Sequence, residues 1–538
     1  MFDPSYNPYP SHRNVVYGKN GMVATSQSLA AQAGLEILQK GGNAIDAAIA
    51  TAACLTVVEP TSNGIGGDAF ALVWTKGELH GLNASGPAPK SASIEAVQAL
   101  GHEKIPQFGW LPITVPGAPA AWAALSERFG KLPLETVLEP AANYAREGFP
   151  VSPTVAYYWK FAFEKNSKNP DAQTFEEWLK VFAPGGRAPK AGEIWKSEGH
   201  AKTLEDIGRT KGESFYRGKL AHKIAEASKE NGGFLTAEDL AAYEPEWVAP
   251  ISANYRGYDV WELPPNGQGI IALSALNILK GFDFSPDGKD ATETVHKQIE
   301  AIKLAFAAGK KAISDPAHMD SAHAPYLLSE DFAQRERARI GDEAIEPEPG
   351  SLPKGGTVYL CTADGEGNMV SFIQSNYWGF GSGIVVPDTG ISMHNRGFEF
   401  SLDKDHANAL KGGKKTYHTI IPGFLTKGNE AIGPFGVMGG YMQPQGHVQI
   451  LMNTIDFALN PQMALDAPRF QWLENKTVEV ENSFPHHVAQ ALAQKGHDIR
   501  IVLNGGAFGR GQIIWRDPET GVLSGGAESR CDSAVAAY

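Results

Sequence analysis

The sequence is poor in cysteine and in basic residues, and each deficit excludes a class of protein. Its 538 residues include only three cysteines, Cys54, Cys361 and Cys531, which are too few and too scattered for a disulfide framework or a zinc site. Acidic residues outnumber Lys and Arg, giving a net charge of −13. That charge offers no basis for binding nucleic acid or an anionic membrane surface.

Long apolar runs, repeats and metal-ligand spacings are also missing. No window approaches the apolar length of a membrane span, and the first residues, "MFDPSYNPYPSHRNVVYGKNG", lack the apolar core and the A-x-A site of a signal peptide. His418, His486 and His487 do not have the spacing of a metal site. We therefore expect a cytoplasmic protein without a metal or a cofactor, and without a nucleic-acid or membrane partner.

The first part of the chain predicts a helical pair. Residues 28–60 form two apolar segments. The first has a cap candidate at Ser28 or Ser26 and a stop signal at Gly41–Gly42. The second begins at Asn43 and is apolar nearly all round, which indicates a buried helix.

The rest of the chain alternates between helical and strand patterns. Residues 115–345 are mostly helical in pattern. After Gly356 come short strands: "TVYLCTADGEGNMVSFIQSNY", "GIVVPDTGISMHN" and "TIIPGFL". Helix returns with "HVQILMNTIDFALNPQMALDAPRF", and strands and a hairpin finish the chain. Strands flanked by helices on both sides predict a layered α/β sandwich.

Thr357 stands at an unusual point in this pattern. A proline- and glycine-rich run, "IEPEPGSLPKGG", precedes it and should not pack as regular structure. If the chain were cut before Thr357, the freed α-amine, with a reference pKa of about 7.7–8.0, would be a base beside the hydroxyl nucleophile. Gly355 and Gly356 would let the scissile carbonyl approach that hydroxyl. The local alternative is a threonine that merely begins a strand.

Nine segments, in order, decide between these interpretations, because together they resemble the γ-glutamyltranspeptidase family of N-terminal-nucleophile hydrolases almost end to end. They are "GGNAIDAAIATAACLTVVEPTSNGIGGDAF", "ITVPGAPAAW", "LPPNGQG", "KLAFAAGKKAISDP", "GGTVYLCTADGEGNMVSF", "GFGSGIVVPDTGISMHN", "GPFGVMGGYMQPQ", "LNPQMALDAPRFQW" and "SRCDSAVAAY".

This resemblance implies an αββα sandwich with additional helices and a proenzyme that cuts itself between Gly356 and Thr357. Residues 1–356 would form a large subunit and residues 357–538 a small catalytic subunit, interlocked as one unit that could dimerise further. Thr357 would be the nucleophile and Ser375 its hydrogen-bonding neighbour. Gly439 and Gly440 would supply the oxyanion N–H groups.

Several positions depart from the family's pattern for gripping a glutamate head group. Arg396 stands where a polar amide is common, and Glu399 where an aspartate is common. Ser85 replaces the arginine that clamps the substrate α-carboxylate. Arg396 could replace that clamp, since guanidinium pairs bidentately with carboxylates, or it could form an internal ion pair with Glu399. Other substrate-binding candidates are Tyr377, in place of an asparagine, Asn395, and Tyr417, His418 and Thr419, in place of paired serines.

The leading hypothesis is an N-terminal threonine amidohydrolase or acyltransferase that cleaves a γ-glutamyl, or similar carboxylate-bearing, amide and passes the acyl group to water or an amine. One alternative is a cephalosporin- or glutaryl-type acylase, or a small amidohydrolase, of the same family. Another is an uncut, non-catalytic binding protein. The segment between Phe400 and Tyr417 is short compared with family members that carry a lid loop, which favours hydrolysis over transfer.

Overall fold

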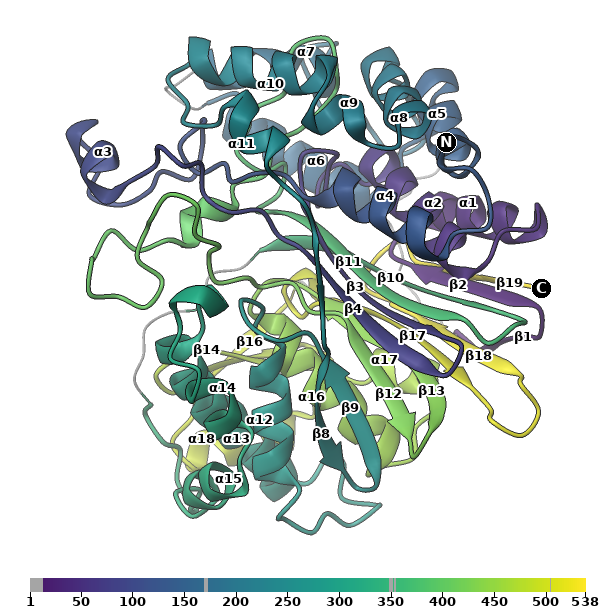
Figure 1. Ribbon diagram of the computed structural model, residues 1–538. Coiled ribbons are helices and arrows are strands. Elements are labelled where there is room, and N and C mark those ends of the chain that lie inside the picture. The colour runs from purple at the N-terminus through teal and green to yellow at the C-terminus, as the bar shows by residue number, and fades with distance from the viewer. Residues whose placement is uncertain (1–12, 169–172, 348–351, 353–354, 504) are drawn as a thin grey trace.

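Two antiparallel sheets of seven strands each lie face to face in the middle of the molecule (Figure 1). The structure is a computed structural model that describes residues 13–168, 173–347, 352, 355–503 and 505–538. The first sheet has the order β19 (Ala534–Ala537), β2 (Gly21–Thr25), β10 (Gly356–Asp364), β11 (Met369–Tyr377), β3 (Asp68–Thr75), β4 (Glu78–Ala84), β7 (Glu246–Val248). The second has the order β1 (Val16–Gly18), β18 (Leu523–Ala527), β17 (Arg510–Arg516), β13 (Glu430–Met438), β12 (Gly423–Lys427), β9 (Tyr258–Glu262), β8 (Ile251–Tyr255).

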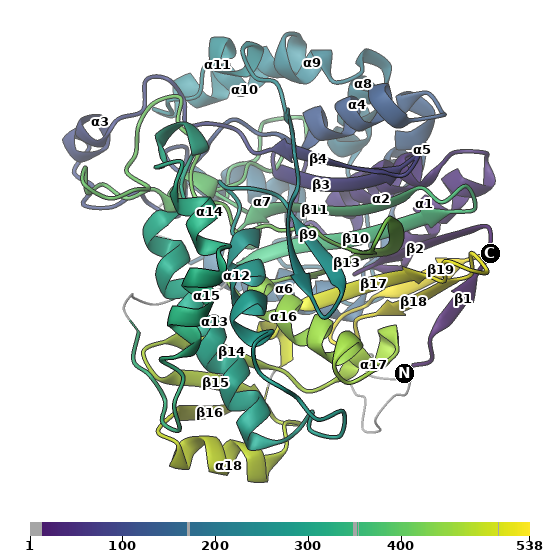
Figure 2. The same ribbon diagram turned by 60° about the horizontal axis from the view of Figure 1, so that its bottom comes forward.

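Helices cover the outer face of each sheet, which completes an αββα sandwich (Figures 1 and 2). On the side of the first sheet lie α1 (Ser28–Gln39), α2 (Ala44–Val58), α4 (Ala118–Phe129), α5 (Leu134–Glu147), α6 (Pro153–Asn166), α7 (Glu176–Phe182), α8 (Glu198–Thr210), α9 (Glu213–Tyr216), α10 (Lys219–Glu230) and α11 (Ala237–Ala241), with α3 (Ile94–Ala99) beyond them. On the side of the second sheet lie α12 (Gly269–Leu279), α13 (Thr292–Ala312), α14 (His323–Leu327), α15 (Glu330–Arg337), α16 (Met442–Ile455), α17 (Pro461–Asp466) and α18 (His486–Gln494). This confirms the predicted fold class.

Smaller elements complete the structure. A three-stranded sheet comprises β14 (Phe470–Glu474), β15 (Thr477–Glu481) and β16 (Asp498–Val502), and a short pair comprises β5 (Phe149–Pro150) and β6 (Ile194–Trp195). Four 3₁₀ turns span Gln173–Phe175, Pro316–His318, Arg396–Glu399 and Gly505–Ala507. Across the described residues, no helix combines the length and apolar character needed to cross a bilayer.

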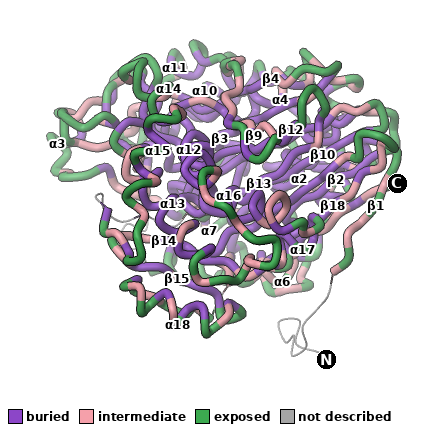
Figure 3. Tube along the Cα trace, turned by 90° about the horizontal axis from the view of Figure 1, so that it is seen from below, coloured by how far each residue is buried: buried purple, intermediate pink, exposed green. Residues whose placement is uncertain are grey.

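The two halves of the sequence are interleaved in both sheets. β10 and β11 lie between β2 and β3 in the first sheet, and β8 and β9 extend the β12 edge of the second. Alternate residues of β10 therefore have different surroundings. Tyr359 and Cys361 pack between the sheets, whereas Val358 and Leu360 pack against the helices. Figure 3 shows the strands buried throughout this region. A cut before Thr357 would leave both sheets dependent on both pieces.

Of the two caps predicted for the helix pair under the first sheet, the one at α2 is confirmed and the one at α1 is wrong. Asn43 caps α2, where its Oδ1 accepts from the backbone N–H groups of Ile45 and Asp46, both at 3.0 Å. Asp46 completes a capping box. At α1 the cap is neither Ser28 nor Ser26. The Gln27 side chain accepts from Leu29 N at 2.6 Å instead.

Two segments after residue 340 contain little regular structure among their described residues. "GIVVPDTGISMHN" does not form the expected strands. It folds into a tight loop with two isolated bridges, Val385 to Ser392 and Met393 to Gly66, because Pro387 and two glycines interrupt any longer ladder. Of the run "IEPEPGSLPKGG", residues 348–351 and 353–354 lie outside the described residues. Its described members lie outside helices and strands up to Gly355, and Gly356 begins β10.

Candidate active site

The hydroxyl groups of Thr357 and Ser375 meet between the two sheets. Thr357 lies near the start of β10 and Ser375 near the end of β11, and Gly356 pairs with Tyr377 in the ladder beside them. The Thr357 Oγ1 and Ser375 Oγ atoms lie 3.1 Å apart, and both side chains are buried. Ser375 Oγ also lies 2.7 Å from the Gly356 carbonyl oxygen and 2.8 Å from the Tyr377 backbone nitrogen. The structure therefore places both predicted residues in one cluster.

The glycine pair of "FGVMGGYMQ" forms the turn between β13 and α16. Gly439 and Gly440 have φ values of 135° and 61°, which a residue with a side chain rarely adopts. A Cβ atom added at Gly355 would lie 3.4 Å from the Cα of Gly440 and 3.0 Å from the Tyr377 carbonyl oxygen. The residue just before Gly356 thus lies against the glycine turn, which brings the predicted oxyanion pair to the expected cleavage point.

Arg396 does not pair with Glu399, so that predicted alternative is wrong. Its Nε donates to Asp68 Oδ2 at 2.9 Å, and its Nη1 donates to Thr419 Oγ1 at 2.8 Å. The Tyr377 ring lies 4.5 Å from the guanidinium carbon, a cation–π contact. The Nη2 atom has no hydrogen-bond partner among the described residues. Arg396 therefore has a buried counter-ion and retains one unused donor.

Asp68 is the centre of this buried ionic group, and sequence reasoning missed it. His394 Nδ1 and His418 Nε2 each lie 3.0 Å from its Oδ2 atom. Burial opposes ionisation of Asp68, but the two histidines outweigh it and hold its pKa well below the usual range. Asp68 is paired directly with Ser375 across β3 and β11, so both side chains point to the same face of the sheet. The sequence "NGIGGDAF" predicts only a tight turn. The strand register, which the sequence does not reveal, brings the Asp68 carboxylate beside Ser375.

Glu399 binds two tyrosine hydroxyl groups in place of an arginine. Tyr377 OH donates to one carboxylate oxygen, and Tyr441 OH donates to the other at 2.8 Å. Lys310 Nζ lies 3.0 Å from the Tyr441 hydroxyl and 4.2 Å from the centre of its ring. Burial and then the Glu399 charge raise the pKa of Tyr377 well above its usual value, so this hydroxyl stays a donor. Tyr377 also has a φ of 70°, a strained conformation for a bulky residue.

Tyr417 and Thr419 are joined to the glycine turn through a residue that sequence reasoning did not single out. The Tyr417 hydroxyl donates to Gln268 Oε1 at 2.8 Å. Gln268 Nε2 donates to the Thr419 carbonyl at 2.6 Å and to the Gly440 carbonyl at 2.9 Å. The motif "LPPNGQG" supplies this glutamine, but nothing in the motif itself indicates which backbone it reaches.

Ser85 and Asn395 lie in neighbouring hydrogen-bond groups of their own. Ser85 Oγ donates to Asn83 Oδ1 at 2.7 Å and accepts from Asn266 Nδ2 at 3.2 Å. Asn395 Nδ2 donates to the Gln107 carbonyl at 3.0 Å. Both side chains are buried, and these hydrogen bonds hold loops around the site rather than reaching Thr357.

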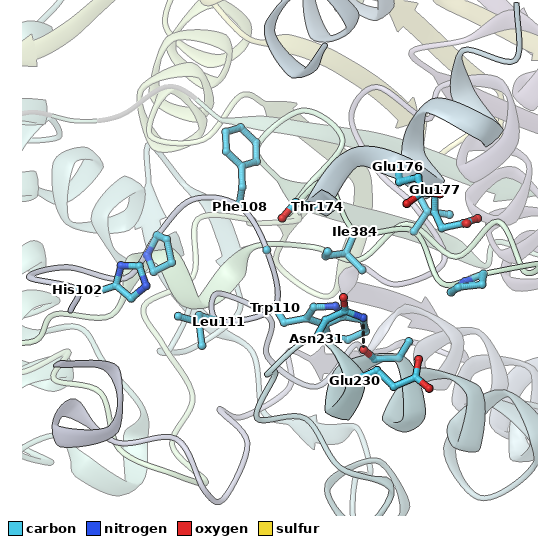
Figure 4. A pocket seen from close by; sticks show the side chains of 15 residues that line it. His102, Phe108, Trp110, Leu111, Thr174, Glu176, Glu177, Glu230, Asn231 and Ile384 are labelled. Atoms are coloured by element: carbon cyan, nitrogen blue, oxygen red, sulfur yellow. Dashed lines mark hydrogen bonds between the residues drawn. The ribbon is translucent and has the colours of Figure 1, made fainter. Parts of the chain in front are cut away.

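A cavity of about 620 Å³ adjoins the loop that Asn395 holds (Figure 4). Phe108 and Trp110 line it, together with carboxylates that include Glu176 and Glu177. Both of these carboxylates pair with Lys180, at 2.9 and 2.7 Å. Among the described residues lining this cavity there is no member of the Thr357 cluster, so we assign it no part in the chemistry.

One group of metal-ligating side chains lies within the described residues, away from the predicted site residues. His296, Glu300 and His497 are buried with ligand atoms within 4.8 Å of one another. Glu300 Oε1 already accepts from the buried ammonium of Lys303 at 2.8 Å. The two histidines lie 2.8 Å apart in a direct hydrogen bond. The lysine supplies the positive charge that a metal would bring, so these residues do not require one.

Burial makes His418 a source of acid sensitivity. Burial, and then the Arg396 charge, lower its pKa to about 3, compared with about 6.5 for an unperturbed histidine. Between these values the unfolded chain binds the additional proton, so the free energy of unfolding falls as pH falls. We expect His418→Asn to flatten this slope between pH 6 and 4 by up to about 1.4 kcal/mol per pH unit. Urea unfolding across that range measures it.

Exposed His222 provides the matched control for that experiment. His222→Asn should leave the pH slope of the wild type unchanged, because this side chain lies at the surface. Identical slopes for His418→Asn and wild type would contradict the assignment of a buried, neutral His418.

Comparison with known proteins agrees with the geometry of the site. The family model described as γ-glutamyltranspeptidase matches residues 30–538. The glutathione hydrolase-like YwrD proenzyme of Bacillus subtilis is 38% identical over 97% of this chain and 99% of its own length. The oxamate amidohydrolase proenzyme of Klebsiella pneumoniae is 34% identical over 96% of this chain and 98% of its own length. A crystal structure of cephalosporin acylase from Bacillus halodurans is 63% identical, covers 100% of this chain and 99% of its own, and superimposes with a TM-score of 0.96. The chain therefore belongs to the γ-glutamyltranspeptidase family of N-terminal-nucleophile enzymes.

Proposed function

We propose that this protein is a self-cleaving N-terminal threonine amidohydrolase, and that Thr357 is first its cleavage point and then its nucleophile. The observation that carries the proposal is the position of Ser375 Oγ, which contacts both Thr357 Oγ1 and the Gly356 carbonyl oxygen. Thr357 Oγ1 is the nucleophile of the proposed cut, and the oxygen belongs to the carbonyl group that it attacks. The same contacts support residues 1–356 and 357–538 as the two subunits.

The donors and acceptors around Ser375 fix the direction of proton transfer. The Gly356 carbonyl can only accept and the Tyr377 N–H can only donate, so Ser375 gives its hydrogen to the carbonyl and accepts from Tyr377. Its remaining lone pair accepts the Thr357 hydroxyl hydrogen. As Thr357 Oγ1 bonds to the Gly356 carbon, its proton passes to Ser375 and the Ser375 proton passes to the carbonyl oxygen. The Gly356–Thr357 C–N bond then breaks, its nitrogen takes a proton, and water hydrolyses the resulting ester.

The freed α-amine of Thr357 then serves as the base for turnover. Its reference pKa of about 7.7–8.0 lets it take the hydroxyl proton near neutral pH. Thr357 Oγ attacks a substrate amide carbonyl, the N–H groups of Gly439 and Gly440 stabilise the oxyanion, and the amine leaves with the proton. Water or a second amine releases the acyl group. The short segment between Phe400 and Tyr417 favours water.

The cut is expected to depend on Thr357 and to be assisted by Ser375. Intact mass under denaturing conditions should give two fragments, 1–356 and 357–538, for the wild type and one chain for Thr357→Ala. Ser375→Ala should slow the cut by about 10²–10⁴-fold, the range of a lost proton-transfer group, and Ser375→Thr should restore most of the rate. A single uncut chain in the wild type would favour the non-catalytic binding protein instead.

The preferred acyl group in this proposal carries a carboxylate but no α-ammonium group. Both Glu399 oxygens are occupied by tyrosine hydroxyl groups, so this carboxylate is not free to receive a substrate ammonium. The unused Nη2 donor of Arg396 offers a partner to a carboxylate and repels an ammonium. The names of the oxamate amidohydrolase and cephalosporin acylase relatives point the same way. Cleavage of γ-glutamyl amides is the second candidate, supported by the name of the Bacillus subtilis relative.

Matched anilides separate the two candidates. We expect kcat/KM for a glutaryl anilide to exceed that for a γ-glutamyl anilide by about tenfold or more, because the ammonium costs at least ~1.4 kcal/mol without a counter-ion. A butyryl anilide, which lacks the carboxylate, tests whether that charge is needed. Arg396→Met should remove the preference for glutaryl over butyryl. Faster cleavage of the γ-glutamyl anilide would establish the second candidate.

A further inference from the structure

Gln268 joins three segments of backbone: its own, from the first half of the chain, and two from the second half, at His418–Thr419 and at Gly440. It lies just before α12, is fully buried, and contacts the carbonyl oxygens of Thr419 and Gly440 through one nitrogen atom. Its own backbone N–H donates to the His418 carbonyl at 3.0 Å. The glutamine comes from residues 1–356, whereas all three of these partners come from residues 357–538.

The orientation of the Gln268 amide follows from its partners. Two backbone carbonyls can only accept, so the NH₂ group must face them and the oxygen must face the Tyr417 hydroxyl. Both hydrogens and the oxygen are then satisfied, as buried polar groups generally are. Gln268 is also the N-cap residue of α12, yet its side chain makes no capping bond. The helix forgoes its usual cap, and the amide reaches the glycine turn instead.

The Gly440 carbonyl is a critical point for the geometry of that turn. A peptide between or beside glycines can rotate at low cost, because no Cβ resists the change. The Gly440 N–H group shares a peptide plane with the Gly439 carbonyl, and the Gly440 carbonyl lies in the next peptide, so bonds to both carbonyls hold Gly440 from either side. The Gly439 carbonyl is held within the turn by Met442 N at 3.1 Å. The Gly440 carbonyl is held by Gln443 N at 3.2 Å and, from the other half of the chain, by Gln268.

We propose that Gln268 is a positioning residue that fixes the Gly439–Gly440 turn for oxyanion binding, with the Tyr417 hydroxyl fixing Gln268 in turn. The inference rests on the proposed function, since it assumes that this turn binds the oxyanion. Gln268 does not touch the reacting atoms. It therefore acts on the chemical step of turnover rather than on substrate binding.

The test compares Gln268→Leu with Gln449→Leu. Leucine keeps the approximate volume and removes the amide bonds. Gln449 is a matched control, because it is also buried and its Nε2 also bridges two backbone carbonyls, those of Gln445 and Phe470, at 3.1 and 3.0 Å. Both variants should lose similar stability in urea unfolding. Only Gln268→Leu should lower the acylation rate constant. The half-time of self-cleavage should stay near that of the wild type in both variants, because Ser375 rather than the turn binds the Gly356 carbonyl oxygen.

The expected loss for Gln268→Leu is about 10–100-fold in acylation, below the 10²–10³-fold for deleting an oxyanion donor outright, with KM changed less than about threefold. Tyr417→Phe, which removes one hydroxyl, should give a smaller loss of about 2–10-fold and remains informative if Gln268→Leu does not fold. Single-turnover kinetics with the glutaryl or γ-glutamyl anilide measures acylation. The half-time of the cut is followed by intact mass.

Different outcomes overturn different statements. A wild type that cuts itself and turns over, with Gln268→Leu and Tyr417→Phe equal to it, contradicts the role of Gln268 alone. Equal losses in Gln268→Leu and Gln449→Leu, or a rise in KM with unchanged acylation, also contradict it. An uncut wild type contradicts the proposed function, and with it this inference.

Discussion

The hydroxyl group of Ser375 is the contact on which the site depends, because it joins the proposed nucleophile, the bond that we propose is cut and the backbone behind them. It lies within hydrogen-bond distance of Thr357 Oγ1, the Gly356 carbonyl and the Tyr377 N–H. Each surrounding feature holds one of these partners. The sheet register places Thr357, the glycine turn lies against the residue before Gly356, and Tyr377 is held by Glu399 and Arg396. The strained backbone of Tyr377 persists because Glu399 holds its hydroxyl group and Arg396 lies over its ring.

The departures from the family's pattern form two hydrogen-bonded groups rather than scattered changes. In one, Asp68 collects Arg396, His394 and His418, and Arg396 reaches Thr419. In the other, Glu399 binds Tyr377 and Tyr441, and Tyr417 binds Gln268. Each group pairs its charged members with partners of its own, as buried charges require, although Arg396 Nη2 stays unused. Changing one member alone would leave a charge or a donor unpaired, so the substitutions are physically coupled.

Local chemistry made part of this site predictable and left the rest hidden. Thr357, its preceding glycines and the Gly439–Gly440 pair could be proposed because the order of nine family-like segments supports functions that few residue types can perform. Asn43 is predictable for the same reason, as a cap is a local feature. Asp68 contacts His418, which lies 350 positions away in the sequence. Gln268 contacts Gly440, which lies 172 positions away. Only the strand register and the packing of both halves reveal such pairs. Closeness in sequence favours an Arg396–Glu399 pair, but the fold brings Asp68 to Arg396 instead.

The most direct test of the central claim is to locate the acyl group on the enzyme. Wild-type protein would be mixed with a glutaryl or γ-glutamyl anilide, quenched in acid during turnover, digested and mapped by mass spectrometry. The account predicts one acyl group on a peptide whose first residue is Thr357, attached through the side-chain oxygen. An acyl group on Ser375 or another residue, or a peptide in which Gly356 is still joined to Thr357 in active enzyme, would contradict it.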